Sequence, residues 1–129
     1  MIVLDAGVLI AHLNGADAFH RAAQEFLEAH AQEQLAASAV TIAEALVHPA
    51  RAGAADRAEY ALERLLVRRI DVLGTDASLI AEIRARTALK LPDSLVIHLA
   101  QKHAASIATT DHAVGRAAAA LQVPVHVLS

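Results

Sequence analysis

The stretch Ile2-Val3-Leu4-Asp5 places three apolar residues directly before a carboxylate. An unbroken run of β-branched and aliphatic residues is typical of a strand buried on both faces, as in a parallel sheet covered by helices. An apolar segment from Gly7 onward then predicts a helix. In such sheets, ligand-binding groups gather beyond the carboxyl ends of the strands, so Asp5 lies where a functional side chain is expected.

The composition sets limits on the class of protein. Of the 129 residues, 56% are hydrophobic and 2% aromatic, which predicts one domain with an aliphatic core. A net charge of −3 lacks the strongly basic character of many nucleic-acid-binding proteins, although bound divalent cations would reverse the local charge. The absence of cysteine excludes disulfides and thiol chemistry. No signal peptide or membrane-spanning run is recognisable, so we expect a cytoplasmic protein.

Strand and helix patterns alternate along nearly the whole chain. Strands are predicted at residues 2–4, 34–37, 70–73, 106–109 and 123–128. Helices are predicted at residues 7–14, 18–30, 40–52, 54–69, 76–87, 93–103 and 111–121, with Pro49 kinking or ending the third of them. This alternation predicts an α/β fold with a mainly parallel sheet.

Four carboxylates, those of Asp5, Glu44, Asp93 and Asp111, occupy related positions. Asp5 and Asp111 follow apolar strands, whereas Glu44 and Asp93 open predicted helices. Each also has a local explanation, since Glu44 fits a capping box that begins at Thr41 and the aspartates fit helix caps or first turns. Strand ends and helix starts share one edge of a parallel α/β sheet, so we expect the four acids to meet there. Their charges would repel unless a cation such as Mg²⁺ or Mn²⁺ lay among them.

The residues around these acids resemble the motifs of PIN-domain ribonucleases, in particular the VapC-type toxins of bacterial toxin–antitoxin systems. The resemblance lies in Ile2-Val3-Leu4-Asp5-Ala6, Thr41-Ile42-Ala43-Glu44, Leu91-Pro92-Asp93-Ser94-Leu95-Val96-Ile97 and Ala108-Thr109-Thr110-Asp111. It implies a three-layer α/β/α sandwich with four or five mainly parallel strands, and a single PIN-like nuclease domain over residues 1–129. It also implies that Asp5, Glu44, Asp93 and Asp111 are catalytic residues and ligands of Mg²⁺ or Mn²⁺.

The resemblance further implies a metal-dependent endoribonuclease that hydrolyses RNA phosphodiester bonds, with tRNA or rRNA as its target. A cognate antitoxin protein and a second copy of the chain are the implied partners. The chemistry is consistent, because divalent cations activate water and relieve charge on the reacting phosphate. Two features depart from the family pattern. Ala6-Gly7 offers no side-chain donor where many members carry Ser, Thr or Asn, and no further acid closely follows Asp111.

Several polar residues near the acids remain open to two interpretations. Thr109 and Thr110 either bond the acids or only favour a strand and a helix cap. The eight histidines fall singly, which predicts surface or helix-end positions, and only His112, beside Asp111, is a candidate for the site. A basic group before Asp93 either contacts phosphates or forms a solvated helix face. This group consists of Arg84, Arg86 and Lys90.

Two other functions compete with the nuclease interpretation. One is a non-catalytic PIN-like module that binds RNA or protein. The other is an aspartate-based phosphatase or receiver domain with Asp5 as nucleophile, although Gly7 stands where that class has a second acid. Some aliphatic side chains exceed the apparent needs of one core and predict an assembly surface that supports a homodimer. They are Leu9, Ile10, Leu62 and Leu66.

Overall fold

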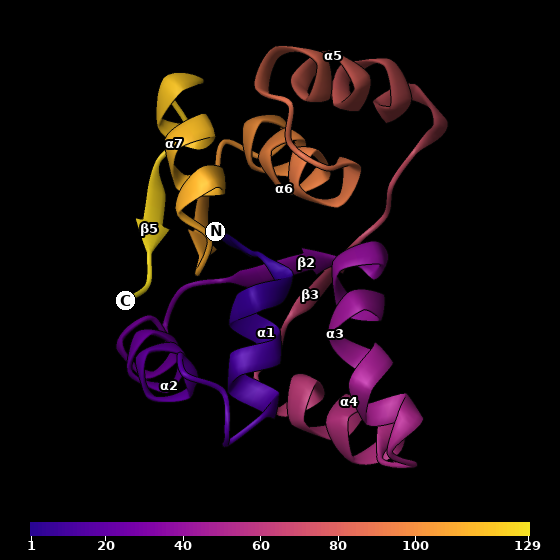
Figure 1. Ribbon diagram of the computed structural model, residues 1–129, viewed down its shortest axis with the longest axis vertical. Coiled ribbons are helices and arrows are strands. Elements are labelled where there is room, and N and C mark those ends of the chain that lie inside the picture. The colour runs from indigo at the N-terminus through magenta and orange to yellow at the C-terminus, as the bar shows by residue number, and fades with distance from the viewer.

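A single five-stranded parallel sheet runs through the middle of the computed structural model, which describes residues 1–129 (Figure 1). Its strands are β1 (Ile2–Leu4), β2 (Leu35–Ser38), β3 (Arg68–Ile70), β4 (Ser106–Thr109) and β5 (Val125–Val127). They lie in the order β3-β2-β1-β4-β5, and every neighbouring pair is parallel. The first strand is therefore central, with Val3 opposite Ala36 on one side and Ile107 on the other.

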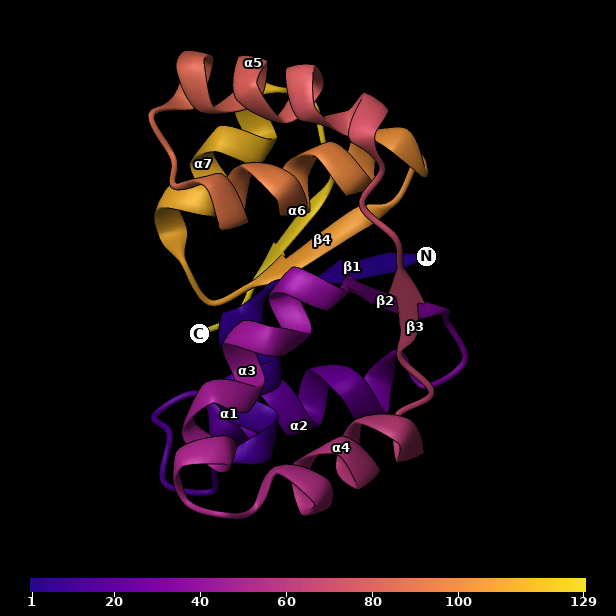
Figure 2. The ribbon, with the colours of Figure 1, turned by 90° about the vertical axis from the view of Figure 1, so that its right-hand side faces the viewer.

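Seven α-helices cover the two faces of this sheet. They are α1 (Ala6–Leu13), α2 (His20–Ala29), α3 (Ala39–Arg51), α4 (Ala55–Arg64), α5 (Ala77–Thr87), α6 (Leu91–Lys102) and α7 (His112–Ala120), with one 3₁₀ turn, η1 (Gly74–Asp76). Helices α1 to α4 lie on one face, while α6 and α7 lie on the other with α5 outside α6 (Figure 2). This arrangement confirms the predicted α/β/α sandwich. No helix is both long and apolar enough to cross a membrane.

The alternation of side chains along β1 divides the core into two parts. Ile2 and Leu4 point toward α1–α4, whereas Val3 points toward α6 and α7, and all three are almost completely buried. Burial of each such side chain stabilises the fold by roughly 1.5–3 kcal/mol. The apolar run before Asp5 is thus buried on both faces, as its composition predicts.

The predicted assembly surface is only partly confirmed as exposed. Leu9 and Leu62 are buried in the core between the sheet and α1–α4, so their assignment to a surface was wrong. Ile10 and Leu66 do remain exposed, Leu66 at 82%.

The helix predicted at residues 54–69 is shorter in the structure, where α4 ends at Arg64. Leu66 adopts a left-handed backbone with φ of 57°, and the chain then turns into β3, where Arg68 pairs with Ala36. Strand β3 therefore begins two residues before the predicted strand. Leucine and arginine are good helix formers, so local propensity predicted a helix up to residue 69. In the structure, pairing of β3 with β2 overrides this propensity.

The start of α3 corrects the interpretation of Glu44 as part of a capping box. The helix is capped by Ser38, whose Oγ accepts a hydrogen bond from Thr41 N at 3.2 Å. Glu44 therefore lies beyond the first turn, on an exposed position, with no capping role. Pro49 does not end this helix, which continues to Arg51, because near the C-terminus a proline removes only one late hydrogen bond.

Candidate active site

Asp5 lies where β1 ends and α1 begins, and it is only 6% exposed. Its Oδ1 accepts a hydrogen bond from Ala6 N at 2.8 Å, and its Oδ2 accepts one from Thr109 Oγ1 at 2.6 Å. Burial raises the pKa of Asp5, although these two hydrogen bonds oppose the shift. Asp5 is therefore a fixed carboxylate at the carboxyl edge of the sheet, and Thr109 does bond an acid as one of its two interpretations predicts.

The Thr109 hydroxyl also links Asp5 to the turn that carries Asp111. Asp111 N donates to Thr109 Oγ1 at 3.0 Å, and Asp111 Oδ1 caps α7 by accepting from Ala113 N at 2.8 Å. Strands β1 and β4 are neighbours, with Leu4 opposite Ala108, so both strand ends reach this point together. One buried hydroxyl thus joins the carboxylate of Asp5 to the backbone amide of Asp111.

Glu44 and Asp93 reach the same edge from helices on opposite faces of the sheet. Asp93 lies in the first turn of α6, whose N-terminal end lies near the start of α7 (Figure 2). The pKa of Asp93 is raised to about 6 by burial and by the charges of Asp5, Asp111 and Glu44. The pKa of Glu44 is raised by partial desolvation and by Asp5, while Lys90 lowers both values. The structure therefore brings the four acids within electrostatic reach of one another.

The donor set of this edge fits a hard divalent cation in its chemistry and charge. The four acids offer oxygen atoms only, which are the ligands that Mg²⁺ and Mn²⁺ prefer. Glu44 and Asp93 accept no hydrogen bond from the protein, so their charge is not satisfied within the fold. As the side chains lie, however, no three acidic or histidine groups converge closely enough to ligate one ion. Binding would require the unbonded carboxylates to turn inward.

The other candidates divide into those near the acids and those elsewhere. Lys90 is the cation whose charge reaches Glu44 and Asp93. Arg84 instead donates to the carbonyl oxygen of Leu89 at 2.8 Å. His112 is exposed and forms no hydrogen bond, so no contact adds it to the site.

Arg86 lines a separate cavity of about 440 Å³ that contains a buried charge network. Asp76 Oδ1 lies 2.8 Å from His98 Nε2 and accepts from Lys102 Nζ at 3.0 Å, while its Oδ2 accepts from Leu73 N at 2.7 Å. The hydrogen bond with His98, followed by those from Leu73 and Lys102, holds the pKa of Asp76 well below its usual range.

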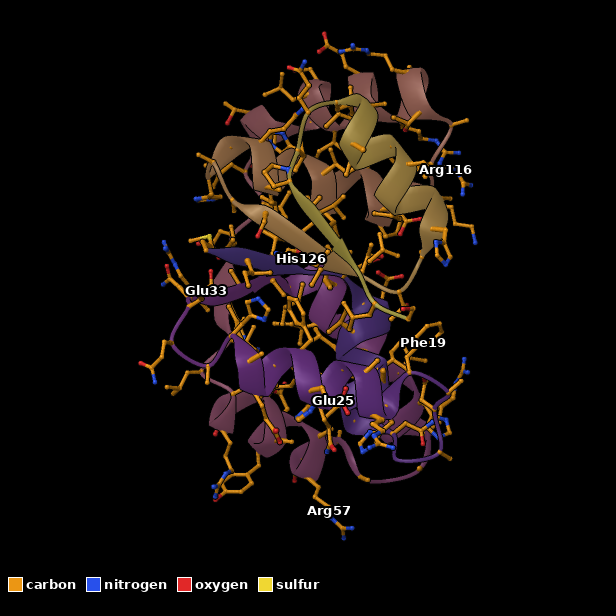
Figure 3. All side chains as sticks on the ribbon, turned by 90° about the vertical axis from the view of Figure 1, so that its left-hand side faces the viewer. Phe19, Glu25, Glu33, Arg57, Arg116 and His126 are labelled. Atoms are coloured by element: carbon orange, nitrogen blue, oxygen red, sulfur yellow. The ribbon has the colours of Figure 1, made fainter.

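This network was not predicted from the sequence, because every histidine was expected at a surface or a helix end. His98 is only 4% exposed and lies inside α6. His98 and Lys102 are four residues apart on one helix, a spacing that would have indicated a shared face. His126 is exposed, as predicted, and it points from β5 toward α2, where its ring lies 5.2 Å from that of Phe26 (Figure 3).

Comparisons with known proteins give matches to one family. The profile of the PIN domain family matches residues 2–120. Among solved structures, a toxin–antitoxin complex from Klebsiella pneumoniae is 27% identical, with a TM-score of 0.73 over 86% of this chain and 87% of that one. VapBC2 from Rickettsia felis, bound to a promoter DNA fragment, is 17% identical, with a TM-score of 0.76 over 100% of both chains. VapC20 from Mycobacterium tuberculosis, a sarcin-ricin loop cleaving toxin, is 19% identical, with a TM-score of 0.74 over 91% of this chain and 95% of that one. No curated protein sequence matches.

Proposed function

The chain belongs to the PIN domain family, and we propose that it is a metal-dependent endoribonuclease that hydrolyses RNA phosphodiester bonds. The observation that carries this proposal is the arrangement of four acids at one edge of the sheet, where the Thr109 hydroxyl links Asp5 to the turn of Asp111, and where the charges of Asp5, Asp111 and Glu44 add to burial in raising the pKa of Asp93. Four acids at one sheet edge, without enough protein cations to balance them, favour a bound divalent cation. Membership of this family also removes the receiver-domain alternative.

Mg²⁺ or Mn²⁺, held by Asp5, Glu44, Asp93 and Asp111, would supply an activated water and relief of charge on the reacting phosphate. The four acids have different parts in holding it. Asp5 is fixed by hydrogen bonds to both oxygens, whereas Glu44 and Asp93 have none and are free to adjust to the ion.

We further propose that the protein is the toxin of a toxin–antitoxin pair and that tRNA or rRNA is its target. The Klebsiella pneumoniae and Rickettsia felis relatives support this proposal, since both are toxin–antitoxin assemblies. A suitable place for an antitoxin tail lies beside Glu44, where a cavity of about 160 Å³ adjoins one of about 390 Å³. Both cavities are lined by Leu13, Asn14, His48 and Pro49. A tail lying there would bury apolar surface and place a basic side chain among the acids in place of metal.

A homodimer is the proposed assembly of the toxin. Apolar side chains that no core contact covers support it, including Ile10 and Leu66, together with Val40 and Val47 on α3. Light scattering at micromolar concentration tests this part, and a monomer would contradict it. Co-expression with the neighbouring open reading frame tests the antitoxin, which should co-purify and suppress cleavage.

The nuclease proposal itself is tested by incubating the purified chain with total cellular RNA in Mg²⁺, in Mn²⁺ and in EDTA. We expect discrete cleavage products with either metal and none in EDTA. Binding of RNA without cleavage under any of these conditions would instead identify a non-catalytic module.

A further inference from the structure

Gly7, in the first turn of α1, lies against the side chain of Thr110. A Cβ atom placed on residue 7 would stand 2.3 Å from Thr110 Oγ1, a separation that real Cβ atoms essentially never show. Glycine is therefore needed here for a close approach, not for an unusual backbone angle. Gly15, at the other end of this helix, has no atom within 4 Å of the equivalent position.

Thr110 lies between Thr109 and Asp111 in the sequence. Both of these residues belong to what we call the acid edge, the edge of the sheet that carries Asp5, Glu44, Asp93 and Asp111. Thr109 Oγ1 donates to Asp5 and accepts from the backbone of Asp111. Thr110 Oγ1, in contrast, is half-buried and has no hydrogen-bond partner in the protein. One of the two adjacent hydroxyls is thus used within the fold, and the other is left free beside the acids.

A free hydroxyl at this place has a chemical property that the acids lack. Ionised carboxylates only accept hydrogen bonds, and they repel the anionic oxygens of a phosphodiester. A threonine hydroxyl donates to such an oxygen without adding charge. A half-buried donor gains most from a ligand that excludes water from it.

We propose that Thr110 is a phosphate-contacting residue whose hydroxyl, seated in the space left by Gly7, donates a hydrogen bond to a non-bridging oxygen of the phosphodiester bound at the four acids. This inference rests on the proposed nuclease function. It assigns Gly7 a role as well, because the absence of a side chain at residue 7 leaves space for the Thr110 hydroxyl. Packing alone would give Thr110 a different signature, because Thr110→Val, which fills nearly the same space, would then cut RNA as well as the parent.

The first experiment compares Thr110→Val with Thr110→Ser in the RNA cleavage assay with Mg²⁺. Valine keeps the shape and removes the hydroxyl, so kcat/KM should fall about tenfold or more, as loss of one such hydrogen bond implies. Serine keeps the hydroxyl, so it should stay within about threefold of the parent. Both should melt within a few degrees of the parent. A Thr110→Val variant that cuts as well as the parent would overturn the inference.

The second experiment tests the contact between Gly7 and Thr110 and transfers the hydroxyl from residue 110 to residue 7. Gly7→Ala should displace Thr110 and lower cleavage, whereas Gly15→Ala is the matched control that should leave it unchanged. In the double variant Gly7→Ser/Thr110→Ala, the Cβ of residue 7 would meet the Cβ of residue 110 at 3.5 Å, an ordinary contact. The Cβ of the new serine therefore has room, and its hydroxyl should restore cleavage relative to Thr110→Ala alone. A double variant no more active than Thr110→Ala would refute the assignment.

The two proposals fail in different ways in these assays. If the parent cuts RNA and Thr110→Val cuts equally well, the phosphate contact is wrong while the nuclease function stands. If the parent does not cut RNA with any divalent metal, the nuclease function fails and this inference fails with it.

Discussion

Asp76 and Asp93 are both carboxylates at the starts of helices on the same side of the sheet, yet their surroundings differ in kind. Asp76 accepts hydrogen bonds from His98, Lys102 and a backbone amide, and its pKa lies well below the usual range. Asp93 accepts none, and its partial burial together with the charges of three other acids raises its pKa to about 6. The comparison shows that neighbouring donors, more than burial, decide whether a carboxylate stabilises this fold. The charge of Asp76 is compensated by groups within the protein, whereas the charge of Asp93 needs a partner from outside.

The largest expected effect is a loss of RNA cleavage when the Asp93 carboxylate is removed. Asp93→Asn removes a proposed ligand without changing the shape of the side chain, so RNA cleavage with Mg²⁺ should fall about 100-fold or more. Asp56→Asn is the matched control, because Asp56 also lies in the first turn of its helix, on α4, but is exposed. Asp93→Asn and Asp5→Asn variants that both cut like the parent would show that the acid assignment is wrong.

The next effect concerns stability, where the two aspartates should respond in opposite directions. Asp76→Ala leaves His98 and Lys102 without their acceptor, so the melting temperature in EDTA should fall clearly. Asp93→Asn relieves repulsion, so it should melt at or above the parent temperature in EDTA. A lower melting temperature for Asp93→Asn would mean that its main role is to stabilise the start of α6.

The smallest effect is the pH dependence of the metal-free protein. Folding raises the pKa of Asp93 from 3.8 to about 6, so the folded state binds this proton more tightly and its stability falls as pH rises through that window. Asp76, with a lowered pKa, acts in the opposite sense and loses its stabilisation as pH falls below about 4. In EDTA the unfolding free energy should decline on the order of 1 kcal/mol from about pH 4.5 to 7 after allowance for solvent screening.

Thermal melts with and without Mg²⁺ measure this dependence. Mg²⁺ and Asp93→Asn should each flatten the decline, because Mg²⁺ compensates the charge that folding penalises and the substitution removes it. A melting temperature that rises steadily from about pH 4.5 to 7 in EDTA would contradict the raised pKa of Asp93.

The sequence predicted the sheet and the place of the acids because both depend on short-range patterns. Three apolar residues before Asp5 indicated a strand buried on both faces, and the alternation of elements then predicted that the other strand ends reach the same edge. The catalytic and metal-binding roles of the four acids stay predictions. The end of α4 was missed because its residues suit a helix, and only pairing between Arg68 and Ala36 decides otherwise.

Contacts between distant helices were the least predictable part of the chain. Asp76 and His98 are 22 residues apart and meet only because α5 packs against α6. The contact between Gly7 and Thr110 is of the same kind, since neither residue alone indicates the other.

The hydrogen bond between Asp5 and Thr109 joins residues 104 positions apart, and this separation bears on how the protein is made. During translation, Asp5 leaves the ribosome early, but its neighbour in the sheet, β4, is among the last strands to be synthesised. A nascent chain that ends before β4 has Asp5, Glu44 and Asp93 but lacks the strand that holds Asp5 in place and carries Asp111. Because domains fold as units once their long-range partners are present, the acid edge assembles only after β4 and the turn to Asp111 have been synthesised. An enzyme of the proposed kind would therefore stay inactive on the ribosome until these residues have emerged.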